Sequence, residues 1–102
     1  MLRIINGNRY NTETAELLCD ISQGDYSTND FKHDDTYLYV TPKGSFFIAG
    51  SGGALSRWAR SVGNDRTGGA GLEVIDKSDA RELLEQYGTS EQTEKYFAVE
   101  DA

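Results

Sequence analysis

The stretch 36–49, TYLYVTPKGSFFIA, constrains the fold more than any other part of the sequence. Residues 36–41 and 45–49 have the alternation and the aromatic and β-branched content of strands. Pro42-Lys43-Gly44 between them has the composition of a tight turn, because proline presets φ and glycine tolerates positive φ. We therefore predict a hairpin at the centre of a sheet. In the first strand, Tyr37 and Tyr39 should lie on one face of the sheet, and Leu38 and Val40 on the other. In the second strand, Phe46 and Ile48 share one face, and Phe47 and Ala49 share the other.

Other segments predict more strands around this hairpin. Residues 2–11 contain Asn6-Gly7, the strongest short hairpin signal. Residues 12–22 alternate in hydrophobicity, with Ala15, Leu17 and Cys19 on one face, which favours a strand over a capped short helix. Residues 72–76 predict another short strand. The connecting segments are expected to be a polar loop over 23–35, a short helical turn over 54–60 and a glycine-rich loop over 63–71.

The last third of the chain predicts helices. Ser78 is the expected N-cap of the first, and Gly88 the expected stop. Thr89-Ser90-Glu91-Gln92 matches a capping box that begins a second helix, which Tyr96 and Phe97 would tie to the core. The predicted class is α+β: one domain over 1–102, with an antiparallel, meander-like sheet of about five or six strands covered by one or two C-terminal helices. The apolar stripe of the first helix is formed by Ala80, Leu83, Leu84 and Tyr87.

The glycine cluster after the central hairpin raises the question of a phosphate site. Gly50, Gly52 and Gly53 precede a possible helix, as in an anion-binding nest, and Arg57, Arg60 and Arg66 follow. The cluster lacks the Lys-Ser/Thr ending of a P-loop and the spacing of a dinucleotide fingerprint. We favour the interpretation that these glycines end a strand and turn the chain sharply.

Charge restricts the partners of the chain. Among its 102 residues are 17 acidic and 10 basic side chains, a net charge of -7, which disfavours nucleic acid and anionic membranes as partners. One cysteine, Cys19, and one histidine, His33, are too few for a structural zinc site, and Cys19 among apolar neighbours is expected to be a core thiol. No long apolar run is present, so we expect a soluble protein of the cytoplasm that needs no cofactor.

The acidic excess is concentrated near the end of the chain. Residues 73–102 carry nine acids and three bases, whereas residues 1–72 are nearly balanced. Such a row of carboxylates on a helix is either a solvated face or an imitation of the regular charge of a nucleic acid backbone. The candidate partner-binding residues are Asp76, Asp79, Glu82 and Glu85, with Asp34 and Asp35 as a second acidic patch.

Three long stretches, RIINGNRYNTETAELL, YLYVTPKGSFFIAGSGGALS and GLEVIDKSDARELLEQYG, resemble a family of small acidic proteins from phages and other mobile elements. The sequence departs from the family pattern at Ser51, where an acid is common, and at Val40, where an arginine is common. Some small acidic proteins of this origin are anti-CRISPR inhibitors. The resemblance implies no catalytic residue.

Three functions remain open on this basis. The first is a non-enzymatic inhibitor whose acidic surface occupies a basic nucleic-acid-binding groove of a CRISPR–Cas complex, acting as a DNA mimic in a monomeric or homodimeric form. The second is a phage accessory module that binds a protein partner through Trp58 and the glycine loop, with packing of Trp58 beneath that loop as the alternative role for this residue. The third, an enzyme, rests only on His33-Asp34-Asp35, which resembles an acid–base or weak metal-binding run but is typically just solvated.

Overall fold

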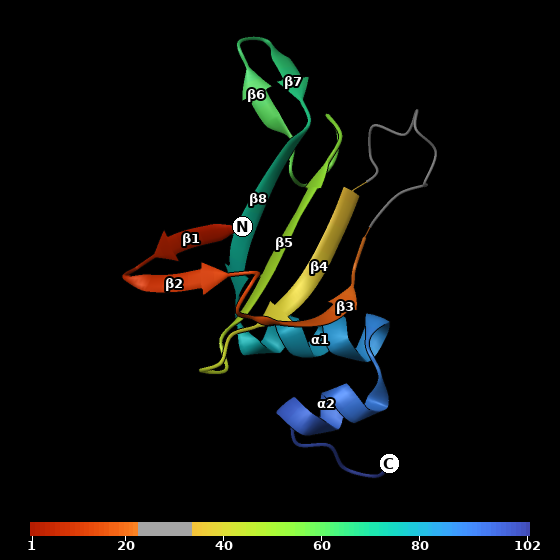
Figure 1. Cartoon of the computed structure of the whole chain (residues 1–102). Helices are drawn as coiled ribbons and strands as arrows, with labels where there is room; N and C mark the ends of the chain where they lie inside the picture. The colour runs from red at the N-terminus through yellow and green to blue at the C-terminus, as the bar shows by residue number, and fades with distance from the viewer. Residues whose placement is uncertain (23–33) are drawn as a thin grey trace.

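The computed structural model describes residues 1–22 and 34–102. Over these residues the chain forms antiparallel strands followed by two helices, which confirms the α+β class (Figure 1). The elements are β1 (Leu2–Ile5), β2 (Asn8–Asn11), β3 (Glu16–Asp20), β4 (Asp34–Val40), β5 (Phe46–Gly52), β6 (Arg60–Val62), β7 (Asp65–Thr67), β8 (Gly69–Ile75), α1 (Lys77–Tyr87) and α2 (Ser90–Tyr96).

The main sheet has the strand order β3-β4-β5-β8, so the predicted central hairpin, β4–β5, does form its centre. The turn between these strands closes with a hydrogen bond from Thr41 N to Ser45 O, 2.8 Å. Gly44 has a φ of 88°, a conformation that glycine adopts at no steric cost. The β1–β2 and β6–β7 hairpins form two further two-stranded sheets.

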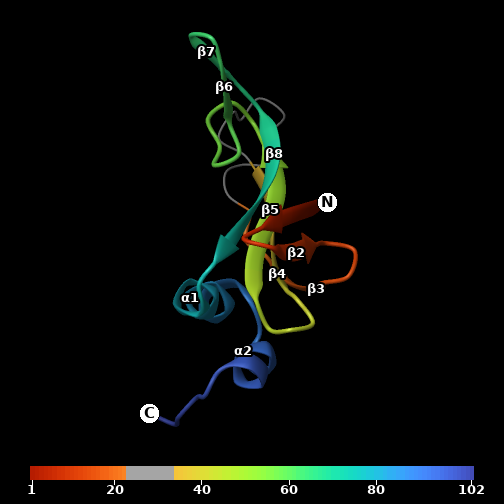
Figure 2. The same cartoon turned by 90° about the vertical axis from the view of Figure 1, so that its left-hand side faces the viewer.

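The helices lie at the lower end of the main sheet, where α1 packs against one of its faces (Figure 2). Leu38 and Ile48 project from this face, and Ala80 and Leu84 of α1 pack against it with none of their surface exposed. The ring of Phe97, which follows α2, stacks on Phe46 with centroids 5.5 Å apart. This layer is the larger hydrophobic core, and its apolar burial is the main stabilising contribution.

The β1–β2 hairpin lies on the opposite face of the sheet (Figure 2). Tyr10 packs edge-on against Phe47, with centroids 5.7 Å apart, and Tyr39 stacks on the same ring at 5.1 Å. Arg3 Nη1 donates a 3.1 Å hydrogen bond to the carbonyl oxygen of Leu72 in β8. These contacts attach the hairpin through a second, smaller core.

The structure confirms the two local predictions for the first 22 residues and corrects one detail. Asn6 and Gly7 both have positive φ, 51° and 78°, as the predicted hairpin turn requires. Residues 16–20 form the favoured strand rather than a helix. A register irregularity between Leu17 and Cys19 interrupts the alternation, so that Leu18 is buried while Leu17 is 53% exposed.

Three predicted connections are wrong in part. Asp34 and Asp35 already belong to β4 instead of the polar loop, whose other residues lie outside the described ranges. Residues 54–59 form turns and no helix. The expected glycine-rich loop over 63–71 is the turn and second strand of the β6–β7 hairpin, followed by β8 from Gly69 onwards. Pairing with β6 makes residues 65–67 extended, and pairing with β5 does the same for residues 69–71.

Both C-terminal helices form as predicted, with one correction. The N-cap of α1 is Asp76 rather than Ser78, and Gly88 ends α1 with its N–H donating to Leu84 O. The capping box of α2 is confirmed, since Thr89 and Gln92 exchange both hydrogen bonds. In the part of the chain that the structure describes, neither helix has the length and apolar character needed to cross a membrane.

Candidate functional site

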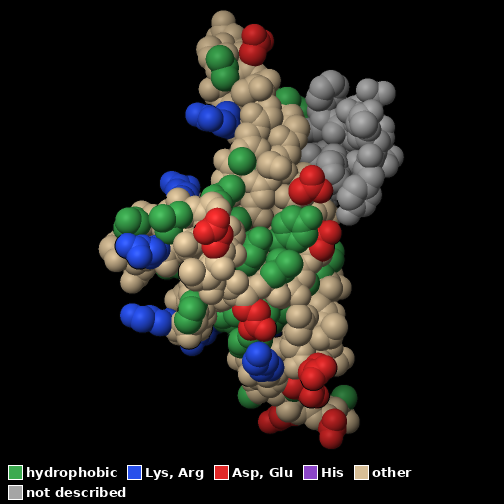
Figure 3. All heavy atoms as spheres, in the orientation of Figure 1, with side chains coloured by type: hydrophobic (Ala, Val, Ile, Leu, Met, Phe, Trp, Pro, Cys, Tyr) green, Lys and Arg blue, Asp and Glu red, His purple; other side chains and the backbone are tan. Residues whose placement is uncertain are grey.

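An acidic surface covers α1, α2 and the C-terminal residues, and we call it the acidic helical end. All of its carboxylates are exposed. Figure 3 shows acids gathered at the lower end of the molecule, over α2 and the C-terminal residues, whereas most of the bases in this view lie toward the β1–β2 hairpin. The bases in the same segment are Lys77, Arg81 and Lys95. The carboxylates of the acidic helical end are Asp76, Asp79, Glu82, Glu85, Glu91, Glu94, Glu100 and Asp101.

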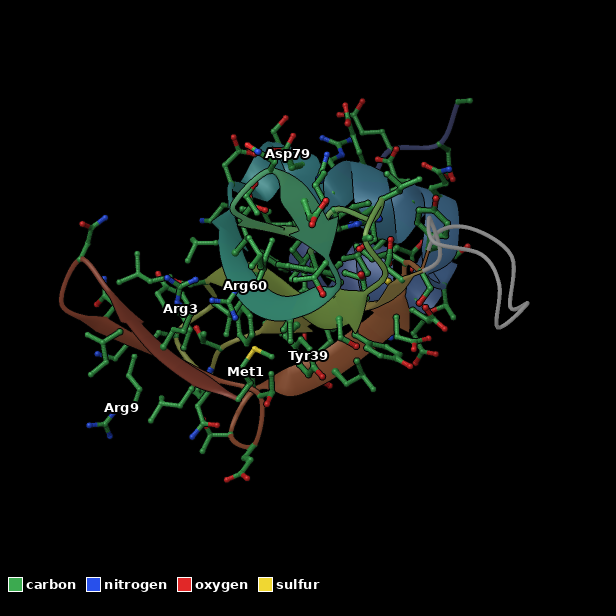
Figure 4. The ribbon with its side chains drawn as sticks, turned by 90° about the horizontal axis from the view of Figure 1, so that it is seen from above. Met1, Arg3, Arg9, Tyr39, Arg60 and Asp79 are labelled. Atoms are coloured by element: carbon green, nitrogen blue, oxygen red, sulfur yellow. The ribbon has the colours of Figure 1, made fainter. Side chains whose placement is uncertain are left out.

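Asp79 and Glu82 are the best-placed members of this surface. They lie three residues apart on α1, which separates their Cα atoms by about 4.5 Å along the helix axis. Both side chains are exposed, and neither forms an ion pair with any residue in 1–22 or 34–102. Burial of Ala80 and Leu84 holds α1 against the sheet. Figure 4 shows Asp79 pointing outward from α1, on the side away from the β1–β2 hairpin.

Glu85 differs from these two because it is already paired. Arg81 Nε lies 2.9 Å from Glu85 Oε1, one helical turn away, and both side chains are 53% exposed. An exposed pair of this kind contributes little stability, about 0.3–0.5 kcal/mol. The charge of Arg81 nevertheless offsets that of Glu85. One of the four carboxylates in the predicted row is therefore partly neutralised.

Asp76 has a structural role in addition to its charge. The backbone N–H of Asp79 donates to Asp76 Oδ1 at 2.8 Å, which satisfies one of the unpaired N–H groups at the start of α1. Part of the capacity of this carboxylate to accept hydrogen bonds is therefore used within the fold.

We expect Asp76→Ala to lower the free energy of unfolding by about 1 kcal/mol, the usual cost of losing an N-cap. Ser78→Ala is the matched control, since Ser78 is exposed and does not cap the helix. The measurement is urea unfolding followed by circular dichroism. Equal effects of the two substitutions would contradict the assignment of Asp76 as the cap.

The second acidic patch is not confirmed as a surface. Asp34 is 1% exposed, its Oδ1 accepts from Thr36 Oγ1 at 2.5 Å, and its Oδ2 lies 3.4 Å from Arg57 Nε. Asp35 is exposed, but β4 begins at the end of the sheet away from α1 (Figure 1). The two predicted acidic patches therefore do not merge. His33 lies outside the described residues.

Trp58 belongs to the buried network around Asp34, which agrees with the alternative that it packs within the fold instead of anchoring a partner. It is only 9% exposed, and its Nε1–H donates to Thr36 Oγ1 at 2.8 Å. Its ring lies against Gly71, where an added Cβ would be 2.9 Å from the ring carbon Cε3. Sequence reasoning missed this network because Thr36 and Trp58 are 22 residues apart.

The glycine cluster ends β5 and leads into a turn, as the favoured interpretation predicts, but two of its glycines are paired within the strand and form no nest. Gly50 and Gly52 lie within β5, paired with both neighbouring strands, and the chain turns only from Gly53. An added Cβ on Gly52 would lie 2.3 Å from Ser56 Oγ. Gly52 thus makes room for the segment that carries Trp58 to fold back over the sheet.

The remaining candidate groups are consistent with structural roles. Cys19 is partly buried, and burial, with a smaller contribution from the charge of Asp20, raises the pKa of its thiol. A raised pKa favours the protonated, less reactive form. The described ranges 1–22 and 34–102 contain no group of three or more histidine, cysteine or acidic side chains arranged to hold a metal ion.

Compared with known proteins, the chain matches no family model, no curated protein and no solved structure.

Proposed function

We propose that the chain is a non-enzymatic inhibitor whose acidic helical end docks in a basic nucleic-acid-binding groove of a partner protein. The observation that carries this proposal is the pair Asp79 and Glu82, which is exposed, lacks ion-pair partners among the described residues, and is held on a helix packed on the sheet. Charged side chains on a supported helix need little ordering when they bind, which lowers the entropic cost of association.

Electrostatics favour a cationic partner. Eight exposed carboxylates and three bases lie between residue 76 and the end of the chain, and two of those bases already contact Glu85 and Glu16. A groove that binds nucleic acid presents lysines and arginines toward regularly spaced phosphates, with about 3.4 Å between charges along one strand. The spacing of about 4.5 Å between Asp79 and Glu82 is of the same order. Carboxylates and phosphates accept the same charge-assisted hydrogen bonds from arginine.

The resemblance to small phage proteins suggests which partner this is. We propose a nucleic-acid-binding subunit of a CRISPR–Cas complex in the cytoplasm of the bacterial host. The chain would compete with DNA or guide RNA by occupying the groove. Competition of this kind weakens as salt screens the charges.

The test begins with phage plating on bacteria that carry an active CRISPR–Cas system directed against the phage. A panel of systems of different types should include one in which expression of the chain restores plating. With the purified complex of that system, the chain should displace target DNA in a mobility-shift assay, less effectively at high salt. Failure to inhibit any system in the panel would contradict the proposed partner.

Asp79→Asn/Glu82→Gln then tests which surface acts. We expect inhibition to weaken about tenfold, equivalent to about 1.4 kcal/mol of binding free energy, with a smaller dependence on salt. The matched control is Glu13→Gln/Asp65→Asn, which removes two exposed carboxylates outside the acidic helical end. Equal losses in the two variants would indicate that net charge, rather than this surface, governs inhibition.

A further inference from the structure

A hollow lies on the other side of the molecule, between the β1–β2 turn and the β4–β5 turn. Its volume is about 320 Å³, near the lower limit for small-molecule sites in proteins. Gly7, Asn8 and Arg9 line it from the hairpin, and Pro42 and Lys43 line it from the turn. Neither the proposed function nor the resemblance assigns a role to this place.

The hollow has a stiff frame. Gly7 and Gly44 both have positive φ, 78° and 88°, which fixes two tight turns. Gly44 N donates to Thr41 O at 2.9 Å, and Ser45 N donates to Thr41 Oγ1 at 3.0 Å. The buried ring of Tyr10, packed against Phe47, holds the hairpin to the sheet beside it. A site framed by two closed turns requires little rearrangement on binding.

The charge of the hollow is opposite to that of the chain. Arg9 and Lys43 line it, and no acidic side chain does, although acids outnumber bases 17 to 10 overall. Both side chains are exposed, and neither forms an ion pair with a residue of the described ranges. Arg9 lines the hollow, and its side chain, a guanidinium on a flexible stem, extends outward from the hairpin (Figure 4).

We propose that this hollow binds a small molecule that carries a phosphate group. Arg9 and Lys43 supply two positive charges for a phosphate dianion, and arginine matches its oxygens with a planar set of donors. The side-chain amide of Asn8 and the hydroxyl of Ser45, which also line the hollow, add neutral donors. Pro42, which is exposed, provides apolar surface for the organic part of the molecule.

The test is a titration of the full chain with inorganic phosphate and with adenosine monophosphate at constant ionic strength, followed by amide chemical shifts. We expect the amides of Gly7, Asn8 and Ser45 to shift and saturate. Adenosine without phosphate should produce no such shifts. Tighter binding of the nucleotide than of inorganic phosphate would identify a phosphate ester as the ligand, and equal binding would identify free phosphate.

Arg9→Gln/Lys43→Gln should raise the dissociation constant at least tenfold. The control Arg60→Gln/Arg66→Gln removes two exposed cations at the β6–β7 hairpin and should leave it unchanged. Equal weakening in both variants, or the absence of saturable shifts with either phosphate compound, would overturn the proposal. Because Asp79 points away from this side (Figure 4), the outcome is independent of the proposed inhibitory function.

Discussion

Replacing Gly50 with alanine is expected to destabilise the fold by about 3 kcal/mol, the upper part of the range for overpacked sites. An added Cβ would lie 1.9 Å from the carbonyl oxygen of Asp35 and 2.8 Å from the Cα of Thr36. Both atoms belong to the backbone of β4, which is paired with β5 over its whole length, so neither can turn away as a flexible side chain would. Relief of the clash requires separation of the two central strands of the sheet.

Urea unfolding of Gly50→Ala and of the neighbouring variant Ser51→Ala provides the measurement. Ser51 occupies the next position of β5 and is exposed, so its substitution should change the free energy of unfolding by about 0.5 kcal/mol or less. If Gly50→Ala were as mild as the control, the close approach of β4 to Gly50 would be refuted.

Gly50 also illustrates why the glycine segments were the least predictable part of the fold. From the sequence alone, glycine indicates conformational freedom, and the segments 50–53 and 63–71 therefore predict turns and loops. In the structure, Gly50, Gly52, Gly69 and Gly71 are in strands, where other atoms come within 3 Å of the position of a Cβ. Such a contact depends on a neighbour far away in the sequence, so no local pattern reveals it.

Elements determined by nearby residues were predicted well. The turns at Asn6-Gly7 and at 42–44 follow from residues that set φ directly. The capping box of α2 requires only Thr89 and Gln92. The N-cap of α1 was misplaced by two residues because Asp76 and Ser78 are both good caps, and only the observed hydrogen bond to Asp79 N distinguishes them.

The candidate site also has one feature that the sequence predicts and one that it does not. The apolar side chains of α1 recur with the period of a helix, so the sequence predicts which face of α1 is buried. Asp79 and Glu82 lie outside that apolar stripe and are therefore expected to be exposed. The burial of Asp34 is not predicted in this way, because its carboxylate is paired with Arg57, which is distant in the sequence, as well as with Thr36 of the same strand. An acid that follows a polar stretch of sequence is therefore expected at the surface, although Asp34 is buried.

Trp58→Ala is expected to have the largest effect of any substitution considered, a loss of about 3–5 kcal/mol in the free energy of unfolding. Trp58 is only 9% exposed. Removal of its ring leaves a cavity between Gly71 and the main core. The same change removes the Nε1–H donor from Thr36 Oγ1, which lies next to the buried Asp34 carboxylate. Domains are typically stable by about 5–15 kcal/mol, so this loss is a large fraction of the total free energy of unfolding.

Trp58→Phe separates packing from hydrogen bonding. Phenylalanine retains most of the apolar ring but cannot donate to Thr36, so we expect a loss of about 1–2 kcal/mol, measured by urea unfolding. A loss of this size should leave the variant folded. Because Trp58 is buried, the variant should also keep the full inhibitory activity proposed for the acidic helical end. If Trp58→Phe stayed as stable as the unmodified chain but lost partner binding, the ring would be part of a contact surface. The acidic helical end would then not be sufficient for binding.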